Sequence, residues 1–242
     1  KGAKVHNAAK TTTGAVSFMD LYSIATGLIG QKGRRGALMI SMDVNHPDIE
    51  DFIDIKTDLD RVTKANISVR INDEFMDAVL NKTMYECKFI VNSGQEVITK
   101  EVDAHKLFMK LITNNWDYAE PGILFWDKIE NNHLLSADKE FKYAGVNPCA
   151  EEPLPAGGSC LLGSINLSEF VTEPFTQHAT FDNDKFKECV RDCVVGLNEV
   201  LEEGLPLHPL EQQKESVSKY RQIGLGVMGI ADMLIKLGIR YG

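Results

Sequence analysis

The sequence predicts an α/β fold in which most of the strands pair in parallel. Short apolar runs with the character of strands alternate with longer segments that carry apolar residues at helical spacing, which is typical of parallel sheets covered by helices. The composition supports a globular protein with a sizeable core, because 43% of the 242 residues are hydrophobic and 25% are charged. The sequence contains no internal repeat and no low-complexity tract.

Helices are predicted wherever apolar residues recur every three or four positions. In the first of them, over 16–29, Ser17 is a candidate N-cap and Gly30 is a natural stop. In the longest, over 181–201, Asp182 is the candidate cap. The other predicted helices cover residues 46–55, 73–80, 104–116, 211–218 and 230–237.

Strands are predicted from short apolar runs and from alternation of polar and apolar residues. Residues 66–71 alternate, so they predict a strand with one buried face. Residues 85–90 and 96–98 predict a hairpin around Asn92-Ser93-Gly94. The other predicted strands are apolar runs over 37–44, 121–127 and 161–167.

Charge and cysteine content narrow the class of protein. The net charge of −9, from 26 Lys and Arg against 35 Asp and Glu, argues against a nucleic-acid partner but leaves room for a polyphosphate ligand. Five cysteines at irregular spacing do not fit a secreted disulfide framework, and there is no membrane-length apolar run or secretory signal. We therefore expect a cytoplasmic protein with no membrane contact. Because the chain begins at Lys1 without a methionine and ends at Gly242 after a helical pattern, we also expect it to be cut from a longer one.

The stretch Asn147-Pro148-Cys149-Ala150-Glu151 carries the strongest chemical signal. It places an amide, a thiol and a carboxylate at alternate positions, and in an extended segment alternate residues point the same way. Pro148 favours extended geometry at the residue before it. The three side chains would then face one space, where a thiol flanked by proton-handling groups can exchange a hydrogen atom with a bound molecule. From spacing alone, a buried cysteine and a plain Asn-Pro turn are the more frequent outcomes.

Other signals have ordinary structural interpretations beside the functional ones. His46 has acidic neighbours whose spacing fits no standard metal site, so we expect a helix-entry residue and assign no metal ligand. Cys189 and Cys193 are four residues apart and are either a metal or redox pair or, as we favour, residues of a helix whose apolar face includes Cys193. Gly224-x-Gly226-x-x-Gly229 matches a dinucleotide fingerprint but lacks the flanking strand–helix–strand context and the downstream acid.

Glycines and cations alternate in Gln31-Lys32-Gly33-Arg34-Arg35-Gly36, where they can approach and bind phosphate. From these residues alone, a basic surface turn is the better interpretation. Polar residues in the loop 1–14, among them His6, could also hold a phosphate, although a solvated connection is the commoner role of such a segment.

Taken together, these stretches resemble ribonucleotide reductase catalytic subunits over essentially the whole chain. The segments that carry the resemblance stand in the family's order: Gly33-Arg34-Arg35-Gly36-Ala37, His46-Pro47-Asp48, Asn66-Ile67-Ser68-Val69, Asn147-Pro148-Cys149-Ala150-Glu151, Gly158-Ser159-Cys160, Ser164-Ile165-Asn166-Leu167 and Ile223-Gly224-Leu225-Gly226-Val227. The resemblance implies that residues 1–242 are a partial catalytic barrel domain, part of a ten-stranded α/β barrel with a central finger loop.

The resemblance also implies a reaction and a set of site residues. The family replaces the 2′-hydroxyl of a ribonucleotide with hydrogen and so makes deoxyribonucleotides for DNA synthesis. By resemblance, Cys149 becomes a thiyl radical that abstracts the 3′-hydrogen, Glu151 acts as general base and Asn147 orients the sugar. Cys160 corresponds to one half of a redox pair whose other half lies upstream of Lys1. The implied substrate-binding residues are Ser17, Asn147, Pro148, Cys149, Ala150 and Glu151. The implied effector and specificity loop comprises His6, Gln31, Lys32, Gly33, Arg34, Arg35 and Gly36.

Cofactors and partners follow from the same resemblance. The pattern of Gly14-Ala15-Val16-Ser17-Phe18-Met19 and Asn147-Pro148-Cys149 is most similar to the adenosylcobalamin-dependent class II enzymes. The family implies ATP or dNTP effectors, a thioredoxin-like reductant and a homodimer formed through the helix 16–29. We expect no turnover from this chain alone, because the family's phosphate-binding loop and reducing tail lie outside it.

Three alternatives stay open at this point. The first, the runner-up within the family, is the large subunit of a class I reductase, which works with a separate metal-containing radical subunit. A second alternative is a nucleotide-binding and dimerisation module without turnover. The third is a thiol redox protein that uses Cys149 and Cys160. For a reductase, the sequence also leaves open whether the substrate is a ribonucleoside diphosphate or triphosphate.

Overall fold

The computed structural model describes residues 1–5, 8–29, 36–91 and 96–242. The chain forms two compact units, Lys1–Pro153 and Leu154–Gly242. Strands and helices alternate through much of both, as predicted, and most of the longer strand pairs are parallel. Among the described residues the strands form one three-stranded and four two-stranded sheets, and no closed barrel.

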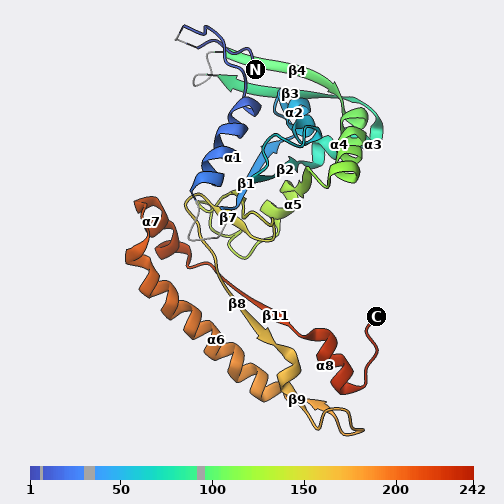
Figure 1. Ribbon diagram of the computed structural model, residues 1–242, viewed down its shortest axis with the longest axis vertical. Coiled ribbons are helices and arrows are strands. Elements are labelled where there is room, and N and C mark those ends of the chain that lie inside the picture. Colours follow the sequence, from blue (N-terminus) through green and yellow to red (C-terminus); the bar gives the residue numbers. More distant parts are fainter. Residues whose placement is uncertain (6–7, 30–35, 92–95) are drawn as a thin grey trace. The chain divides into compact units, whose positions relative to one another are not determined.

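A three-stranded parallel sheet organises the first unit (Figure 1). Strand β2 (Ala65–Ile71) lies at its centre, between β1 (Leu38–Asp43) and β5 (Gly122–Phe125). The register pairs Ile40 with Ile67 and Met42 with Val69, so these apolar side chains share one face of the sheet. The opposite face of β2 carries Asn66, Ser68 and Arg70, as the alternating pattern predicted.

Helices cover the apolar face of this sheet. The largest side chains of the core come from α2 (Ile49–Asp54) and α3 (Asp73–Asn81), where Phe52 and Phe75 are fully buried in the same cluster as Ile67 and Val69 of β2. The other helices of the unit are α1 (Met19–Leu28), α4 (Ala104–Tyr118) and α5 (Trp126–Asn131).

Capping residues explain where several helices begin. Asn72 accepts a hydrogen bond from Phe75 N at α3 and Asp103 accepts one from Lys106 N at α4. The predicted N-cap at Ser17 is wrong: α1 begins after a 3₁₀ turn over Val16–Phe18, and the Ser17 hydroxyl donates to Gly14 O at 2.9 Å. Gly30, the predicted stop, lies outside the described residues.

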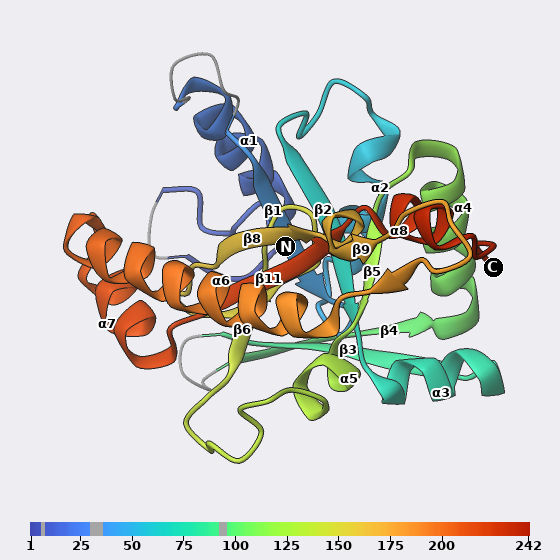
Figure 2. The same ribbon diagram turned by 90° about the horizontal axis from the view of Figure 1, so that it is seen from below.

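The antiparallel hairpin of β3 (Met84–Val91) and β4 (Glu96–Asp103) is longer than the sequence predicted. Residues 99–101 of β4 are polar and exposed, so they gave no apolar signal. They are held in the strand by their partners, since the register pairs Lys100 with Cys87 and Glu101 with Glu86. Figure 2 shows the two strands side by side along their length. The predicted turn residues 92–94 lie outside the described part of the chain.

The second unit is built on one parallel strand pair and a long helix. Strand β8 (Leu161–Asn166) pairs with β11 (Ile223–Met228), and α6 (Asn183–Gly204) lies along both, as Figures 1 and 2 show. Asp182 caps α6, as predicted, by accepting a hydrogen bond from Lys185 N. The other elements of the unit are β9 (Val171–Thr172), β10 (Thr180–Phe181), α7 (Glu211–Tyr220) and α8 (Ile230–Leu237). Within the described residues, no helix has the length and apolar character to span a membrane.

The glycine-rich segment at 224–229 is structural in this unit. Gly224 and Gly226 lie within β11, and Gly229 has a φ of 71° at the start of α8. A Cβ at Gly229 would lie 2.1 Å from Asn166 Oδ1, which itself accepts a hydrogen bond from Ser168 N. Only glycine meets both demands, the left-handed conformation and the close approach.

We expect Gly229→Ala to lower the free energy of unfolding by about 2 kcal/mol, because the left-handed conformation alone costs a residue with a Cβ about 1–2 kcal/mol. The matched control is Gly196→Ala within α6, where a Cβ would meet nothing within 4 Å. That change should leave the stability unchanged or raise it by up to about 1 kcal/mol. Urea unfolding followed by circular dichroism measures both, and equal stabilities for the two variants would contradict the assignment.

Candidate active site

Residues 147–152 form a small loop that is closed by its own hydrogen bonds. Asn147 N donates to Glu152 O at 3.1 Å, and Glu152 N donates back to the side-chain Oδ1 of Asn147, also at 3.1 Å. Ala150 N donates to Asn147 O at 3.0 Å, which closes a β-turn with Pro148 and Cys149 at its two central positions. The loop thus presents Cys149 at its tip, where the thiol is exposed.

The extended geometry that the sequence predicted for this stretch is wrong. The β-turn reverses the chain, and Ala150 adopts a φ of 66°. The physical reason is that Pro148 presets the backbone for the second position of a turn, and asparagine is favoured at the first. The rule that alternate residues share a face therefore does not apply to Asn147, Cys149 and Glu151, although the loop keeps all three within five residues.

Two side chains of the central strand β2 hold this loop and the strand before it. Asn66 Nδ2 donates to Pro148 O at 2.7 Å. Arg70 donates from one guanidinium nitrogen to Ala144 O at 3.3 Å, and Ala144 belongs to β6 (Tyr143–Val146), which leads into the loop. Because Asn66 and Arg70 lie on the same face of β2, the loop sits against the polar face of the sheet.

Arg70 is itself fixed by two further contacts. Its guanidinium forms an ion pair with Asp43 Oδ2 at 2.7 Å and lies over the ring of Trp126, 4.7 Å from the centroid. An arginine that pairs with a carboxylate and stacks on an indole has little rotational freedom. Neither Asn66 nor Arg70 was predicted as a site residue. Both belong to the polar half of the alternating pattern, and Asn66 also lies in one of the segments that carry the resemblance.

The loop is chemically suited to hydrogen-atom and proton transfer. Cys149 and Glu151 are exposed, so both can meet a bound molecule. The Asn147 side chain is half-buried and its oxygen is engaged by Glu152 N, which leaves its NH₂ group as the donor for a ligand. A thiol, a carboxylate and an amide donor are therefore presented by one hydrogen-bonded loop.

Cys160 lies in the other compact unit, directly before β8, with its side chain half-buried. Cys189 and Cys193 lie on α6 with their sulfur atoms 3.9 Å apart, both half-buried.

Among the described residues, no group of three or more His, Cys, Asp or Glu side chains is arranged to hold a metal ion. His46 enters α2, as predicted: its Nδ1 accepts a hydrogen bond from Asp48 N at 3.0 Å, and burial lowers its pKa.

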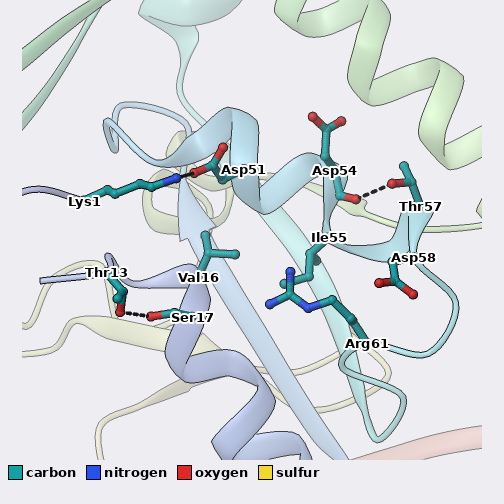
Figure 3. Close-up of a pocket in the computed structure, with 10 residues that line it drawn as sticks. All are labelled: Lys1, Thr13, Val16, Ser17, Asp51, Asp54, Ile55, Thr57, Asp58 and Arg61. Carbon is teal, nitrogen blue, oxygen red and sulfur yellow. Dashed lines mark hydrogen bonds and ion pairs between the residues drawn. The ribbon is translucent and has the colours of Figure 1, made fainter.

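Ser17, predicted to bind substrate, lies in the 3₁₀ turn before α1 in the first unit. It lines a pocket of about 390 Å³ in the first unit, which Figure 3 shows with Thr13, Asp54 and Arg61 among its walls. Its neighbours Val16 and Met19 belong to the core on the helix-covered face of the sheet, whereas the loop contacts Asn66 on the opposite face. That Ser17 binds substrate beside Cys149 stays a prediction.

Most of the predicted effector loop lies outside the described residues, namely His6, Gln31, Lys32, Gly33, Arg34 and Arg35. Gly36 is described, and a Cβ there would lie 2.6 Å from Thr26 O, so this position requires glycine. Helix α1 exposes large apolar side chains beside it, with Ile24 61% exposed and Leu28 80% exposed. Such a face is suited to packing against a partner.

Thiol reactivity should separate Cys149 from the buried Cys87. Cys87 is fully buried, and burial raises the pKa of its thiol to about 11, so at pH 8 roughly one molecule in a thousand carries the reactive thiolate. We expect iodoacetamide at pH 8 to label Cys149 and to spare Cys87 in the folded chain, as measured by peptide mass spectrometry. Labelling of Cys87 as fast as Cys149 would contradict the structure.

The raised pKa of Cys87 also makes the stability of the fold depend on pH. Because the unfolded chain loses the Cys87 proton at a lower pH than the folded chain, the free energy of unfolding should fall as the pH rises from about 9 toward 11.

Comparison with known proteins identifies the family. The family model for the ribonucleotide reductase barrel domain matches residues 1–242. The chain is 38% identical over 231 residues, 95% of its length and 29% of the relative's, to a vitamin B12-dependent ribonucleoside-diphosphate reductase of Thermoplasma acidophilum. It is 34% identical over 242 residues, 99% of its length and 33% of the relative's, to the protein of that name from Mycobacterium tuberculosis.

A more distant relative is the ribonucleoside-diphosphate reductase subunit alpha of Chlamydia pneumoniae, 26% identical over 99% of this chain and 25% of the relative. The chain thus spans about a third or less of the length of these relatives. The mixed helices and strands of this chain fit the α/β fold that the family match implies. The chain belongs to the ribonucleotide reductase family, and its 242 residues match that family's barrel domain.

Proposed function

We propose that this chain is part of the catalytic barrel of an enzyme that reduces ribonucleotides to deoxyribonucleotides, with Cys149 as the radical-bearing thiol. One observation carries the proposal: a hydrogen-bonded loop on the polar face of a parallel sheet presents an exposed thiol together with a carboxylate and an amide. We further propose that the two compact units belong to a single barrel domain in the full-length protein.

Each residue of the loop has a role that its chemistry suits. The thiyl radical of Cys149 takes the hydrogen atom from C3′ of the ribose, and it can return that atom later because S–H and activated C–H bonds have similar strengths. Glu151 accepts the proton of the 3′-hydroxyl, and a positioned general base typically contributes about 10²–10⁴-fold. The NH₂ group of Asn147 donates to a sugar oxygen and fixes the orientation of the substrate.

The overall reaction needs two electrons and two protons in addition to the radical. Two thiols supply them and become a disulfide, the 2′-hydroxyl leaves as water, and hydrogen takes its place on C2′. We assign one of these thiols to Cys160. Its partner and a thioredoxin-like protein that reduces the disulfide complete the cycle.

We propose adenosylcobalamin as the radical generator, because the two most similar relatives described above bear the name of B12-dependent enzymes. When bound, this cofactor supplies an organic radical that takes the hydrogen atom of a thiol. The exposed position of Cys149 fits this need, since a buried thiol could not meet a radical source. We also propose that effector nucleotides bind near Gly36 and that α1 forms a homodimer interface through its exposed apolar face.

The test is a reduction assay with the full-length enzyme that contains this chain. Ribonucleoside diphosphates and triphosphates are each supplied with a dithiol, with and without adenosylcobalamin. We expect deoxyribonucleotide only when the cofactor is present. If product forms without cobalamin but with a metal-containing radical subunit, the proposed reaction stands and the radical generator is that subunit instead of adenosylcobalamin. Nucleotide binding without product under either condition would favour the binding and dimerisation module.

A further inference from the structure

A contact between β2 and the Cys149 loop has no role in the reaction as described so far. Asn66 is the second residue of β2, and its Nδ2 donates to the carbonyl oxygen of Pro148 at 2.7 Å. The two residues are 82 positions apart in the chain, so the bond joins the sheet directly to the loop. The oxygen that it holds belongs to the peptide group that immediately precedes Cys149.

The orientation of this peptide group decides the conformation of Cys149. In a β-turn, the central peptide has two orientations, and flipping it converts the third residue from a negative to a positive φ. Cys149 is not among the residues with positive φ, so the turn has the first of the two orientations. A flip would move the Pro148 oxygen away from Asn66 and force Cys149 into a conformation that disfavours residues with a Cβ.

The strand before the loop is fixed independently by Arg70, four residues further along β2. Arg70 holds Ala144 O of β6 and is itself anchored by Asp43 and Trp126. Because Arg70 fixes the strand that leads into the loop, the hydrogen bond from Asn66 mainly restricts rotation of the peptide group at the tip of the turn. The loop's own hydrogen bonds involve Asn147, Ala150 and Glu152, and none of them holds the Pro148 carbonyl.

We propose that Asn66 is a positioning residue that locks the peptide between Pro148 and Cys149 and so fixes where the Cys149 thiol points. This inference rests on the proposed function, in which that sulfur must lie against C3′ of the substrate. A displacement of the reacting atom by about 1 Å can cost on the order of 10²-fold in rate. One hydrogen bond at the tip therefore has a larger effect on turnover than on substrate binding.

The test compares Asn66→Asp with Asn81→Asp in the full-length enzyme. Aspartate keeps the shape of asparagine but replaces the donor with an acceptor that repels the Pro148 oxygen. Asn81 is the matched control, because its Nδ2 also donates to a main-chain oxygen, Asp77 O at 2.9 Å, but on the exposed end of α3. Hydrogen exchange is measured at the amides of Ala150 and Glu152, which report on closure of the loop.

We expect these amides to exchange at least about tenfold faster in Asn66→Asp and at the wild-type rate in Asn81→Asp. Equal exchange in all three proteins would overturn the proposal. In the reduction assay, kcat should fall about 10–100-fold in Asn66→Asp while KM stays within about twofold. A raised KM with an unchanged kcat would also overturn it, because Asn66 would then be a substrate contact.

The two readouts keep this inference distinct from the proposed function. If the wild-type enzyme forms no deoxyribonucleotide, the proposed function fails, and the exchange rates still decide whether Asn66 holds the loop. If the wild-type enzyme is active and Asn66→Asp retains full kcat, the proposed function stands and the role of Asn66 fails.

Discussion

Replacement of Cys149 by serine should abolish deoxyribonucleotide formation in the full-length enzyme, by at least about 10⁴-fold in kcat, because the change removes the group on which the whole reaction depends. The O–H bond of serine is much stronger than the S–H bond of cysteine, so the hydroxyl cannot take part in reversible hydrogen-atom transfer. The side chain is exposed at the tip of a turn, and the loop's hydrogen bonds involve none of its atoms. Folding and nucleotide binding should therefore be unchanged.

Cys189→Ser supplies the control for this experiment. Cys189 lies on α6 with its side chain half-buried, and it has no role in the proposed reaction. We expect it to retain kcat within about twofold, since changes away from core and site residues are usually mild. Steady-state product formation and equilibrium binding of a nucleoside triphosphate are measured for each variant. A Cys149→Ser enzyme that makes product at more than about one hundredth of the wild-type rate would exclude a radical at this thiol.

Phe52→Ala should produce the largest loss of stability in the first unit, about 3–5 kcal/mol in the free energy of unfolding. Phe52 lies on α2 and is fully buried in the hydrophobic core of the first unit. Truncation removes the aromatic ring and leaves a cavity in a tightly packed region, so both the lost transfer energy and the cavity contribute.

Urea unfolding of the chain measures this effect by tryptophan fluorescence. The sequence contains two tryptophans, Trp116 and Trp126, and both lie in the first unit, so the signal reports on the unit that contains Phe52. Leu80→Ala on α3 is the control: the Leu80 side chain is 75% exposed, and its loss should change the stability by no more than about 0.5 kcal/mol. Similar losses for both variants would show that Phe52 does not lie in a packed core.

Local patterns were sufficient to predict most helices and a largely parallel pairing of the strands, but not which strands pair. The period of apolar residues placed α4 and α8 to within about two residues, and alternation in 66–71 identified both the strand β2 and its polar face. The predicted length of strand β4 was too short, because its polar residues 99–101 are held by pairing with β3 rather than by burial. The short strands β9 and β10, of two residues each, contain too few residues for any periodicity.

The sequence predicted which residues of the loop form the candidate site, but not their conformation or their contacts. The sequence singled out Asn147, Cys149 and Glu151, yet the extended conformation expected for them is a turn, because the turn preference of Asn-Pro prevailed over the expected alternation. The contacts of Asn66 and Arg70 join segments more than 70 residues apart. Such contacts depend on how β6 and the loop lie across the sheet, which no local pattern encodes.

The central claim is that Cys149 exchanges a hydrogen atom with C3′ of the substrate. Single-turnover reduction of a 3′-deuterated ribonucleotide by the full-length enzyme, with wild type beside Cys149→Ser, tests it most directly. We predict that the wild-type enzyme forms deoxyribonucleotide more slowly from the deuterated substrate than from the ordinary one, with deuterium returned to C3′, and that Cys149→Ser forms none. Deoxyribonucleotide from the serine variant at more than about one hundredth of the wild-type rate would contradict the claim.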